Sequence, residues 1–225
     1  MALTGWTFTV RAVDIDEQPL PGEPPREYVL RLAKSKALAS APLARPDEII
    51  LTADTTVADG MRILGKPENA AEAREMLRSL RGREHTVFTA IGVLGMPGTQ
   101  VPPGTQAPLA GRLLTDICAT SVWMRGYTDA EIEAYISSGD PFDKAGAYAI
   151  QNQTFQPVER IEGCYACVVG LPVCHVVRAL AQFGLRPPAD VTAACPEQIE
   201  EDTPCRVYEE ILRGQEGPAA AASED

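Results

Sequence analysis

The chain has 225 residues, of which 45% are hydrophobic, so it is long enough to form one α/β domain with a substantial core. Its formal net charge of −11 argues against a nucleic-acid-binding surface. No apolar run reaches the roughly 18–20 residues of a membrane helix, and the N-terminus lacks the basic and apolar regions of a signal peptide. These features predict a cytoplasmic protein that has no nucleic-acid or membrane partner.

The acidic residues are concentrated at the C-terminus. Residues 185–225 contain ten acidic and three basic residues. We predict a domain over residues 1–184 and a largely disordered acidic tail over residues 185–225, in which only RVYEEILRG (206–214) can form a short helix. The six cysteines are too few for a disulfide framework in a chain of this length, so we expect reduced thiols.

Strand and helix patterns alternate in the first half of the chain. TFTVRAVDID (7–16) is typical of a strand, and a helix is expected over residues 25–40. EIILTADTTVADG (48–60) indicates a buried strand that ends in polar residues, where open α/β sheets place their ligands. NAAEAREMLRSLRG (69–82) predicts a helix with Asn69 as its N-cap.

The second half continues this alternation. Strands are expected over residues 85–95 and 115–124, and we interpret the Pro/Gly-rich connector 96–111 as an exposed hairpin loop. A helix over residues 127–140 begins with a capping box. Another helix is predicted over residues 171–184, where apolar residues recur on one face between a proline and a glycine.

Two acidic positions are candidates for chemistry. DIDE (14–17) places three carboxylates in four residues beside a turn. Such oxygen-rich clusters suit Mg²⁺ or Mn²⁺, and an exposed acidic turn is the alternative. Asp54 directly follows the apolar run IILTA, where burial of an unpaired carboxylate is costly. It can bind a metal or act as a general base, and a cap on the following turn is equally consistent with the sequence.

Two lysines are candidates for anion binding. Lys36 falls at the centre of the apolar stripe of its predicted helix, where a lysine either extends outward to water or meets an anion. Lys66, in LGKPE, lies between a strand and a helix start, from which it can reach a phosphate. The chain has no Walker pattern GxxxxGK[ST], so this is not a P-loop.

FDKAGAYAIQNQ (142–153) is so rich in Gly, Ala and Tyr that its backbone is expected to pass close to another element. Lys144 supplies a positive charge there. Gln151 supplies a donor and an acceptor that suit the edge of a nucleobase. The alternative is a tight structural crossing with polar ends in solvent.

Cys164, Cys167, Cys174 and His175 formally make up a zinc-ligand set. However, Cys174 and His175 are adjacent in a predicted helix, where neighbouring side chains point about 100° apart. The chain also has no second CxxC. We therefore interpret the cysteines as small packing residues, with a zinc-binding module as the alternative.

Taken together, these segments resemble the Maf family of nucleoside triphosphate pyrophosphatases. The resemblance covers most of residues 8–184, in the family's order. It implies an α/β fold with a mixed twisted sheet flanked by helices, in two lobes with a central cleft, as well as a divalent cation and a homodimer. The matching stretches are DIDE, REYVLRLAKSKA, ADTTVADGMRILGKPENAAEAREMLRSLRGREHTVFTAIGV, YTDAEIEAYISSGDPFDKAGAYAIQ and IEGCYACVVGLPV.

The resemblance also implies a role for each matching residue. Asp54 matches the general base, and Glu17 and Asp54 match the carboxylates that hold the metal. The KAGAY…Q form is similar to the branch that acts on dTTP and UTP, whereas the branch that prefers 7-methyl-GTP has an acidic residue in place of Gln151. Lys36 and Lys66 match the triphosphate-binding lysines, Thr55 matches a substrate-specificity position, and Gln151 matches the base-recognising glutamine. With Lys144, the charge in KAGAY, the expected substrate-binding residues are Lys36, Thr55, Lys66, Lys144 and Gln151.

The N-terminus departs from the family pattern. Family members begin with a strand and a Ser-x-Ser-Pro-Arg-Arg segment whose arginines contact substrate, and neither precedes DIDE in this chain. We therefore expect an N-terminally incomplete domain with weak activity or none. The alternative function is that of a catalytically impaired Maf-like protein that acts through protein contacts in cell-division arrest.

Overall fold

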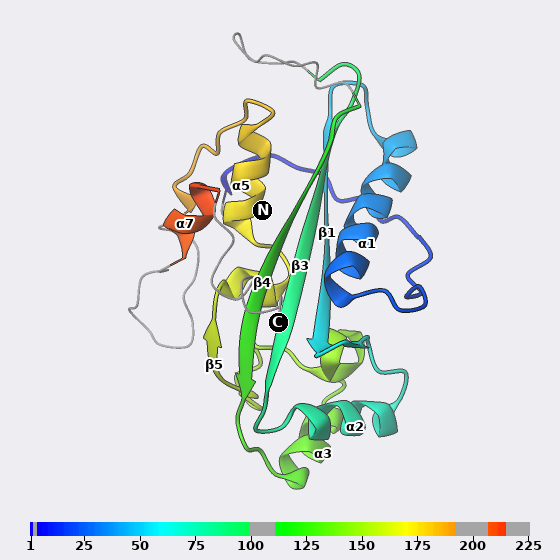
Figure 1. Cartoon of the computed structure of the whole chain (residues 1–225), viewed down its shortest axis with the longest axis vertical. Coiled ribbons are helices and arrows are strands. Elements are labelled where there is room, and N and C mark those ends of the chain that lie inside the picture. Colours follow the sequence, from blue (N-terminus) through cyan, green and yellow to red (C-terminus); the bar gives the residue numbers. More distant parts are fainter. Residues whose placement is uncertain (2–3, 100–110, 192–206, 215–225) are drawn as a thin grey trace.

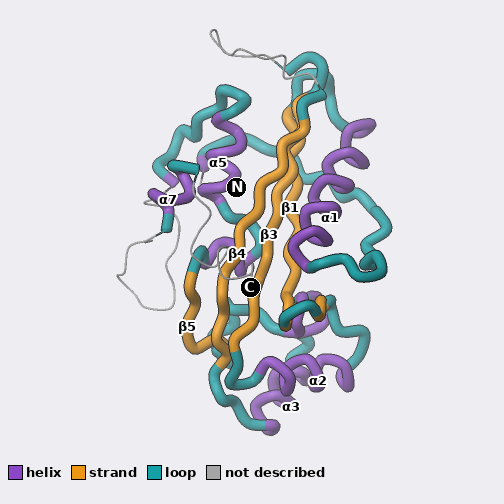
Figure 2. The backbone as a smooth tube through the Cα atoms, in the orientation of Figure 1, coloured by secondary structure: helices purple, strands orange, loops and turns teal. Residues whose placement is uncertain are grey.

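The structure, a computed structural model, describes residues 1, 4–99, 111–191 and 207–214. Within these ranges one five-stranded sheet has the order β2-β1-β3-β4-β5. Its three long strands run along most of the length of the molecule (Figures 1 and 2). The strands are β1 (Ile49–Asp59), β2 (Arg62–Leu64), β3 (Glu84–Gly95), β4 (Leu113–Met124) and β5 (Val158–Glu162).

The predicted α/β class, with a sheet flanked by helices, is confirmed. The neighbouring strands of the described sheet all pair antiparallel, whereas a mixed sheet was expected. The reason lies in the connections, because the chain leaves β1 and enters β3 at the same end of the sheet. Likewise, β3 and β4 are the two arms of a hairpin. A parallel pair would need a crossover to the opposite end. The expected hairpin connector, 96–111, lies mostly outside the described residues.

The strand predicted over residues 7–16 is wrong. Residues 6–20 contain no helix or strand, and Phe8 and Val10 are 49% and 85% exposed. Arg11 binds Glu48 through an ion pair of 2.9 Å instead of contributing to a sheet. An alternating pattern makes a strand only where a neighbouring strand accepts its hydrogen bonds, and no described strand lies beside this segment.

Helices cover both faces of the sheet. On one face, α1 (Pro25–Ser40) packs through Val29 and Ala33 against Phe88 and Ala90. On the other face, α5 (Val173–Ala181) packs against the alternate residues of β3, and α4 (Tyr165–Val169) lies beside it. Figure 1 shows α1 and α5 on either side of the long strands. Gly92 of β3 lets α1 approach the sheet closely. A Cβ at this position would lie only 2.8 Å from the Ala33 carbonyl oxygen of α1.

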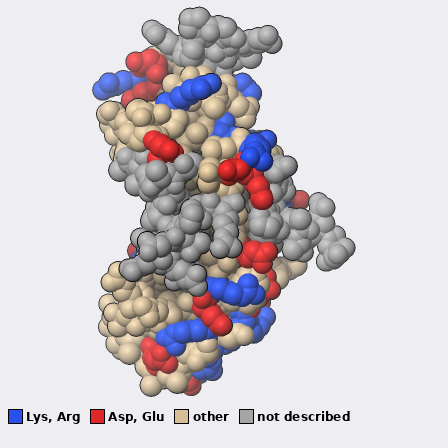
Figure 3. Space-filling view, turned by 90° about the vertical axis from the view of Figure 1, so that its left-hand side faces the viewer, with Lys and Arg blue, Asp and Glu red and all other residues tan. Residues whose placement is uncertain are grey.

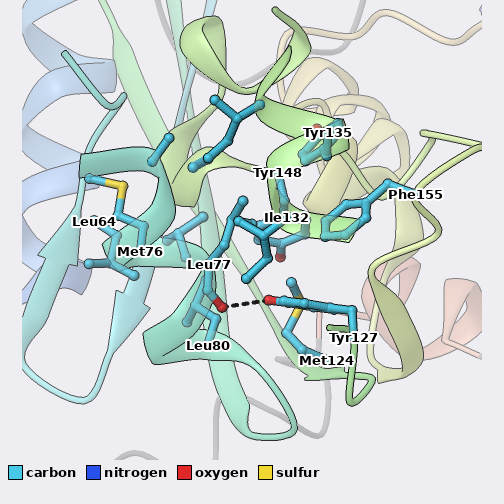
Figure 4. Packing of buried hydrophobic residues seen from close by; sticks show 14 of the residues in the cluster. Leu64, Met76, Leu77, Leu80, Met124, Tyr127, Ile132, Tyr135, Tyr148 and Phe155 are labelled. Carbon is cyan, nitrogen blue, oxygen red and sulfur yellow. Dashed lines mark hydrogen bonds between the residues drawn. The ribbon is translucent and has the colours of Figure 1, made fainter. Parts of the chain in front are cut away.

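A second lobe caps one end of the sheet. It contains α2 (Ala70–Leu80) and α3 (Asp129–Ser137), and Figure 4 shows its apolar core. The buried Tyr127 hydroxyl donates a 2.7 Å hydrogen bond to the carbonyl oxygen of Leu77, which ties α2 to the start of α3. The predicted caps are confirmed, because Asn69 accepts two backbone N–H bonds at the start of α2 and a capping box begins α3.

The short helix predicted near the C-terminus is confirmed. It is α7 (Tyr208–Leu212), which packs on α5 through Ile211, a residue that is only 1% exposed. Arg178 of α5 donates a 2.8 Å hydrogen bond to the Ile211 carbonyl oxygen. Beneath α7 lie four buried cysteines that belong to the same apolar cluster, which confirms the packing role predicted for them: Cys118, Cys164, Cys167 and Cys174. The other two cysteines, Cys195 and Cys205, lie outside the described residues.

Two further features of the described residues are the hydrophobicity of the helices and the distribution of surface charge. Among the described residues, none of the helices combines the length and hydrophobicity that a membrane crossing requires. On the face shown in Figure 3, basic and acidic side chains alternate, and those that are described there form no continuous basic patch.

Two buried histidines predict how stability depends on pH. His85 and His175 are 3% and 1% exposed, and burial lowers the pKa of each to about 4. An unfolded histidine has a pKa of about 6.5, so between pH 6.5 and 4 only the unfolded chain takes up these protons. We expect the free energy of unfolding to fall with decreasing pH in this window, by up to about 1.4 kcal/mol per pH unit for each histidine.

Urea unfolding between pH 7.5 and pH 5 measures this slope. His175→Gln removes one of the two titrations, and its slope over this range should be about half that of the unmodified chain. Equal slopes in the two proteins would show that burial of His175 does not control the loss of stability.

Candidate active site

A cavity of about 540 Å³ lies at the open edge of β1, where the two lobes meet. The short β2 pairs only with Val57–Asp59, so the preceding part of β1 has no strand neighbour on this side among the described residues. The structure brings all seven residues that sequence analysis singled out into the lining of this cavity: Glu17, Lys36, Asp54, Thr55, Lys66, Lys144 and Gln151.

Lys36 connects the two candidate metal-binding carboxylates. Its Nζ lies 2.7 Å from Glu17 Oε1 and 2.5 Å from Asp54 Oδ1. The Lys36 side chain is 21% exposed and that of Asp54 is 10% exposed. The helical pattern left open whether Lys36 extends outward to water or meets an anion. In the structure its ammonium group contacts two carboxylates of the protein, those of Glu17 and Asp54.

Burial and ion pairing have opposing effects on the pKa values in this cluster. Burial raises the pKa of Asp54, and the hydrogen bond from Lys36 offsets only part of that rise. Burial also disfavours the charged form of Lys36, but its hydrogen bonds to two carboxylates outweigh that effect and raise its pKa. Lys36 therefore stays protonated, whereas Asp54 is a stronger base than an ordinary aspartate.

The Tyr28 side chain holds the segment that carries Glu17. Its hydroxyl donates a 2.9 Å hydrogen bond to the Glu17 carbonyl oxygen. Burial raises the pKa of Tyr28, with a further contribution from the charge of Asp54, so the hydroxyl remains a neutral donor. Helix α1 thus supplies both Lys36 and the residue that anchors Glu17, which explains how an otherwise irregular segment reaches the cavity.

A close backbone crossing brings two lysine-bearing segments together. Gly146 packs on β1, and a Cβ at this position would lie 2.9 Å from Val57 Cγ1. Its N–H donates a 3.0 Å hydrogen bond to the Gly65 carbonyl oxygen, which joins the segment of Lys144 to the segment of Lys66. The close approach expected from the density of small residues in KAGAY is confirmed. Lys144 also hydrogen-bonds Asp143, its neighbour in sequence.

Sequence analysis missed a buried pair behind the cavity wall. Tyr148 lines the cavity, and its hydroxyl lies 2.7 Å from His85 Nε2. Because burial lowers the pKa of His85 to about 4 and raises that of Tyr148, this bond joins two neutral groups at neutral pH. His85 lies on β3, 63 residues before its partner, and no motif in the sequence links the two.

Sequence analysis also missed Thr89. This fully buried residue of β3 has its Oγ1 2.8 Å from Thr55 Oγ1, and the same hydroxyl donates a 2.7 Å hydrogen bond to the Cys167 carbonyl oxygen. On the same side of the cavity, Gln151 lies within hydrogen-bonding reach of the Tyr165 hydroxyl. Thr55 and Gln151 therefore both lie beside α4.

The donor set of the cavity suits a hard divalent cation. Carboxylate oxygens of Glu17 and Asp54, from separate segments, converge on one positive atom, the Nζ of Lys36. Oxygen ligands of this kind suit Mg²⁺ or Mn²⁺. In the described part of the chain no three His, Cys, Asp or Glu side chains are grouped for metal binding. Two carboxylates hold Mg²⁺ only where other oxygen ligands, such as substrate phosphates and water, complete its coordination.

Comparisons with known proteins place the chain in one family. A family model described as Maf-like protein matches residues 1–183. A dTTP/UTP pyrophosphatase of Anaeromyxobacter dehalogenans is 42% identical over 184 residues, which cover 82% of this chain and 87% of the relative. A dTTP/UTP pyrophosphatase of Chromobacterium violaceum is 43% identical to this chain, and the match covers 78% of this chain and 83% of the relative. A dTTP/UTP pyrophosphatase of Dehalococcoides mccartyi is 39% identical, and the match covers 91% of this chain and 84% of the relative.

Proposed function

The chain belongs to the Maf family, and we propose that it is a nucleoside triphosphate pyrophosphatase that hydrolyses dTTP and UTP to the monophosphate and pyrophosphate. The observation that carries the proposal is the cavity at the edge of β1, whose lining combines lysines, carboxylates and the amide of Gln151. Relatives that share about two fifths of its sequence are named dTTP/UTP pyrophosphatases.

The lysines supply positive charge for a triphosphate. Lys36, Lys66 and Lys144 line one cavity, although the chain as a whole is acidic. A cavity with low-dielectric walls strengthens the attraction of such charges for phosphate oxygens. In the proposed complex, Lys36 and Lys66 hold the pyrophosphate portion that leaves, and Lys144 adds charge from the opposite segment.

Glu17 and Asp54 would hold the divalent cation, Mg²⁺ or Mn²⁺, together with phosphate oxygens. When bound, the ion would offset negative charge that develops on the triphosphate. The phosphate groups of the substrate would also draw the Lys36 ammonium away from the two carboxylates, which would leave their oxygens free for the cation.

Asp54 is the proposed general base. A water oxygen forms a bond to the α-phosphorus while the bond from this phosphorus to the α–β bridging oxygen breaks, and Asp54 accepts the proton of the water. Pyrophosphate is the leaving group. The raised pKa of Asp54, caused mainly by burial, makes the carboxylate better suited to accept that proton.

Gln151 is proposed to bind the base. It offers one acceptor and two donors, which match the alternating carbonyl and N–H groups of uracil and thymine. The carboxylate that the resemblance associates with the 7-methyl-GTP branch would offer acceptors alone. The side chain lines the cavity beside Tyr165 of α4.

Pyrophosphate release from dTTP, UTP, CTP, GTP and ATP tests the proposal. We expect dTTP and UTP to have the highest kcat/KM, and removal of divalent cations with a chelator to abolish turnover. A preference for GTP, or release of single phosphate groups, would contradict the proposed reaction. If no triphosphate is hydrolysed, the alternative of a catalytically impaired protein gains support.

A further inference from the structure

The direction of one hydrogen bond determines what the Thr55 side chain presents to the cavity. Thr89 has a single hydroxyl proton, and it donates that proton to the Cys167 carbonyl oxygen at 2.7 Å. A carbonyl oxygen cannot donate, so this assignment has no alternative. In the 2.8 Å contact between the two threonine hydroxyls, Thr89 must then accept and Thr55 must donate.

Thr55 therefore faces the cavity as an acceptor only. Its one proton points toward Thr89, which is fully buried, and the lone pairs of its oxygen are what a ligand meets. Gly170 keeps this oxygen accessible, because a Cβ at that position would lie 3.2 Å from Thr55 Oγ1. Phosphate oxygens and base carbonyls cannot bind an acceptor, so the nucleotide group that Thr55 can bind is an N–H or an O–H.

The position of Thr55 identifies that group. Asp54 and Thr55 are consecutive residues of β1, so their side chains point to opposite faces of the sheet. Asp54 faces Lys36 of α1, and Thr55 faces the α4 side. If Asp54 acts at the α-phosphorus, as proposed above, the group beside Thr55 is the one bonded to that phosphate, which is the sugar.

The base has its own place farther along the same wall. Gln151 lies near Tyr165, at the start of α4, whereas Thr55 lies near Gly170, just past its end. Five residues of helix span about 7.5 Å, which is comparable to the separation between a ribose hydroxyl and the far edge of a pyrimidine. The sugar hydroxyl that dTTP and UTP share is the 3′-hydroxyl.

We propose that Thr89 is a positioning residue that fixes the Thr55 hydroxyl as a hydrogen-bond acceptor, and that Thr55 accepts the proton of the nucleotide 3′-hydroxyl. This inference rests on the proposed nucleotide pyrophosphatase function. It assigns Thr55 to the sugar and leaves the base to Gln151. Thr89 acts without touching the substrate.

The test compares nucleotides that differ only at C3′. dTTP carries a 3′-hydroxyl, the 2′,3′-dideoxy analogue lacks it, and the 3′-fluoro analogue presents an acceptor alone. For the unmodified protein we expect kcat/KM to be about 3- to 10-fold higher for dTTP than for either analogue, the usual effect of one hydrogen bond. A protein that treats the three nucleotides alike would overturn the proposal.

Thr89→Val tests the positioning role. The Thr55 proton loses its acceptor in this variant and can turn toward the cavity, so the preference for dTTP over the 3′-fluoro analogue should fall toward unity. The matched control is Thr120→Val. Thr120 is also fully buried and donates to a carbonyl next to α4, that of Cys164, but its hydroxyl accepts from the Cys164 N–H rather than from Thr55. The Thr120→Val control should keep the preference for dTTP over the 3′-fluoro analogue. Loss of this preference in both variants would contradict the specific role of Thr89, because it would follow from any disturbance of α4.

A binding measurement separates this inference from the proposed function. Calorimetric affinities for dTMP and its 3′-deoxy and 3′-fluoro analogues need no turnover. A protein that releases no pyrophosphate but binds dTMP 3- to 10-fold more tightly than both analogues would contradict the reaction and support the role of Thr55. If Thr89→Val does not fold, the comparison of nucleotides with the unmodified protein and with Thr55→Val still decides, because Thr55→Val should abolish the preference.

Discussion

Replacement of Asp54 by Asn is expected to lower kcat for dTTP by about 10²–10⁴-fold, the usual contribution of a general base. Asn has nearly the same shape, and its carbonyl oxygen can still accept the hydrogen bond that Lys36 donates to Asp54. It cannot take up a proton from water, and it is a weaker ligand for a cation. The fold should persist, because the side chain is replaced without a change in volume.

Asp59→Asn is the matched control for this experiment. Asp59 lies on the same strand and also forms an ion pair, with Arg83 at 2.8 Å, but it lies outside the cavity lining. The control should retain kcat within a few-fold. Circular dichroism would verify that both variants are folded. If Asp54→Asn retained activity within about tenfold of the unmodified protein, the general-base role would be excluded.

Gly146→Ala is expected to lower both stability and activity. Gly146 has a φ of +69°, which costs a residue with a side chain about 1–2 kcal/mol. The added methyl group would also lie 2.9 Å from Val57 Cγ1, and overpacking of this kind costs about a further 1–3 kcal/mol. Relief of the clash would move the segment that carries Lys144 and Tyr148 away from the cavity, so kcat/KM should fall as well.

Gly60→Ala separates backbone strain from the clash. Gly60 has a similar φ of +60°, but nothing lies within 4 Å of the position of its added Cβ. The control should therefore show the conformational cost alone, with activity unchanged. Urea unfolding gives the free energies, and pyrophosphate release gives the activities. If Gly146→Ala and Gly60→Ala lowered the free energy of unfolding equally, the contact between the added methyl group and Val57 would make no contribution.

The parts of the site that could be predicted are those with local sequence signals. Asp54 stands out because a carboxylate follows an apolar run, and Lys36 because it interrupts an apolar stripe. Asn69 is recognisable as a cap from its neighbours alone. In each case the physical reason lies within a few residues, so one sequence is sufficient. The family resemblance then added Thr55, which has no local signal of its own.

The parts that could not be predicted depend on contacts between distant segments. Thr89 is one of several threonines in the strands, and its role follows from a carbonyl 78 residues away. β5 reads VERIE, which has too much charge to stand out as a strand, and α4 has only five residues, too few for a helical pattern. The error at residues 7–16 has the same origin, because a strand needs a neighbour that its own sequence does not specify.

The open edge of β1 has a consequence for how molecules of this protein behave together. An unpaired strand edge can pair with the edge of another chain, and natural proteins often place lysines there to prevent it. Here the cavity beside this edge is lined by charged side chains of both signs, among them Lys36, Lys66 and Asp54, which edge-to-edge pairing would remove from water. Under the proposed function, the lysines among them also bind the triphosphate. One set of side chains would then both oppose edge-to-edge pairing and bind the nucleotide, so that nucleotide binding and self-association compete for the same edge.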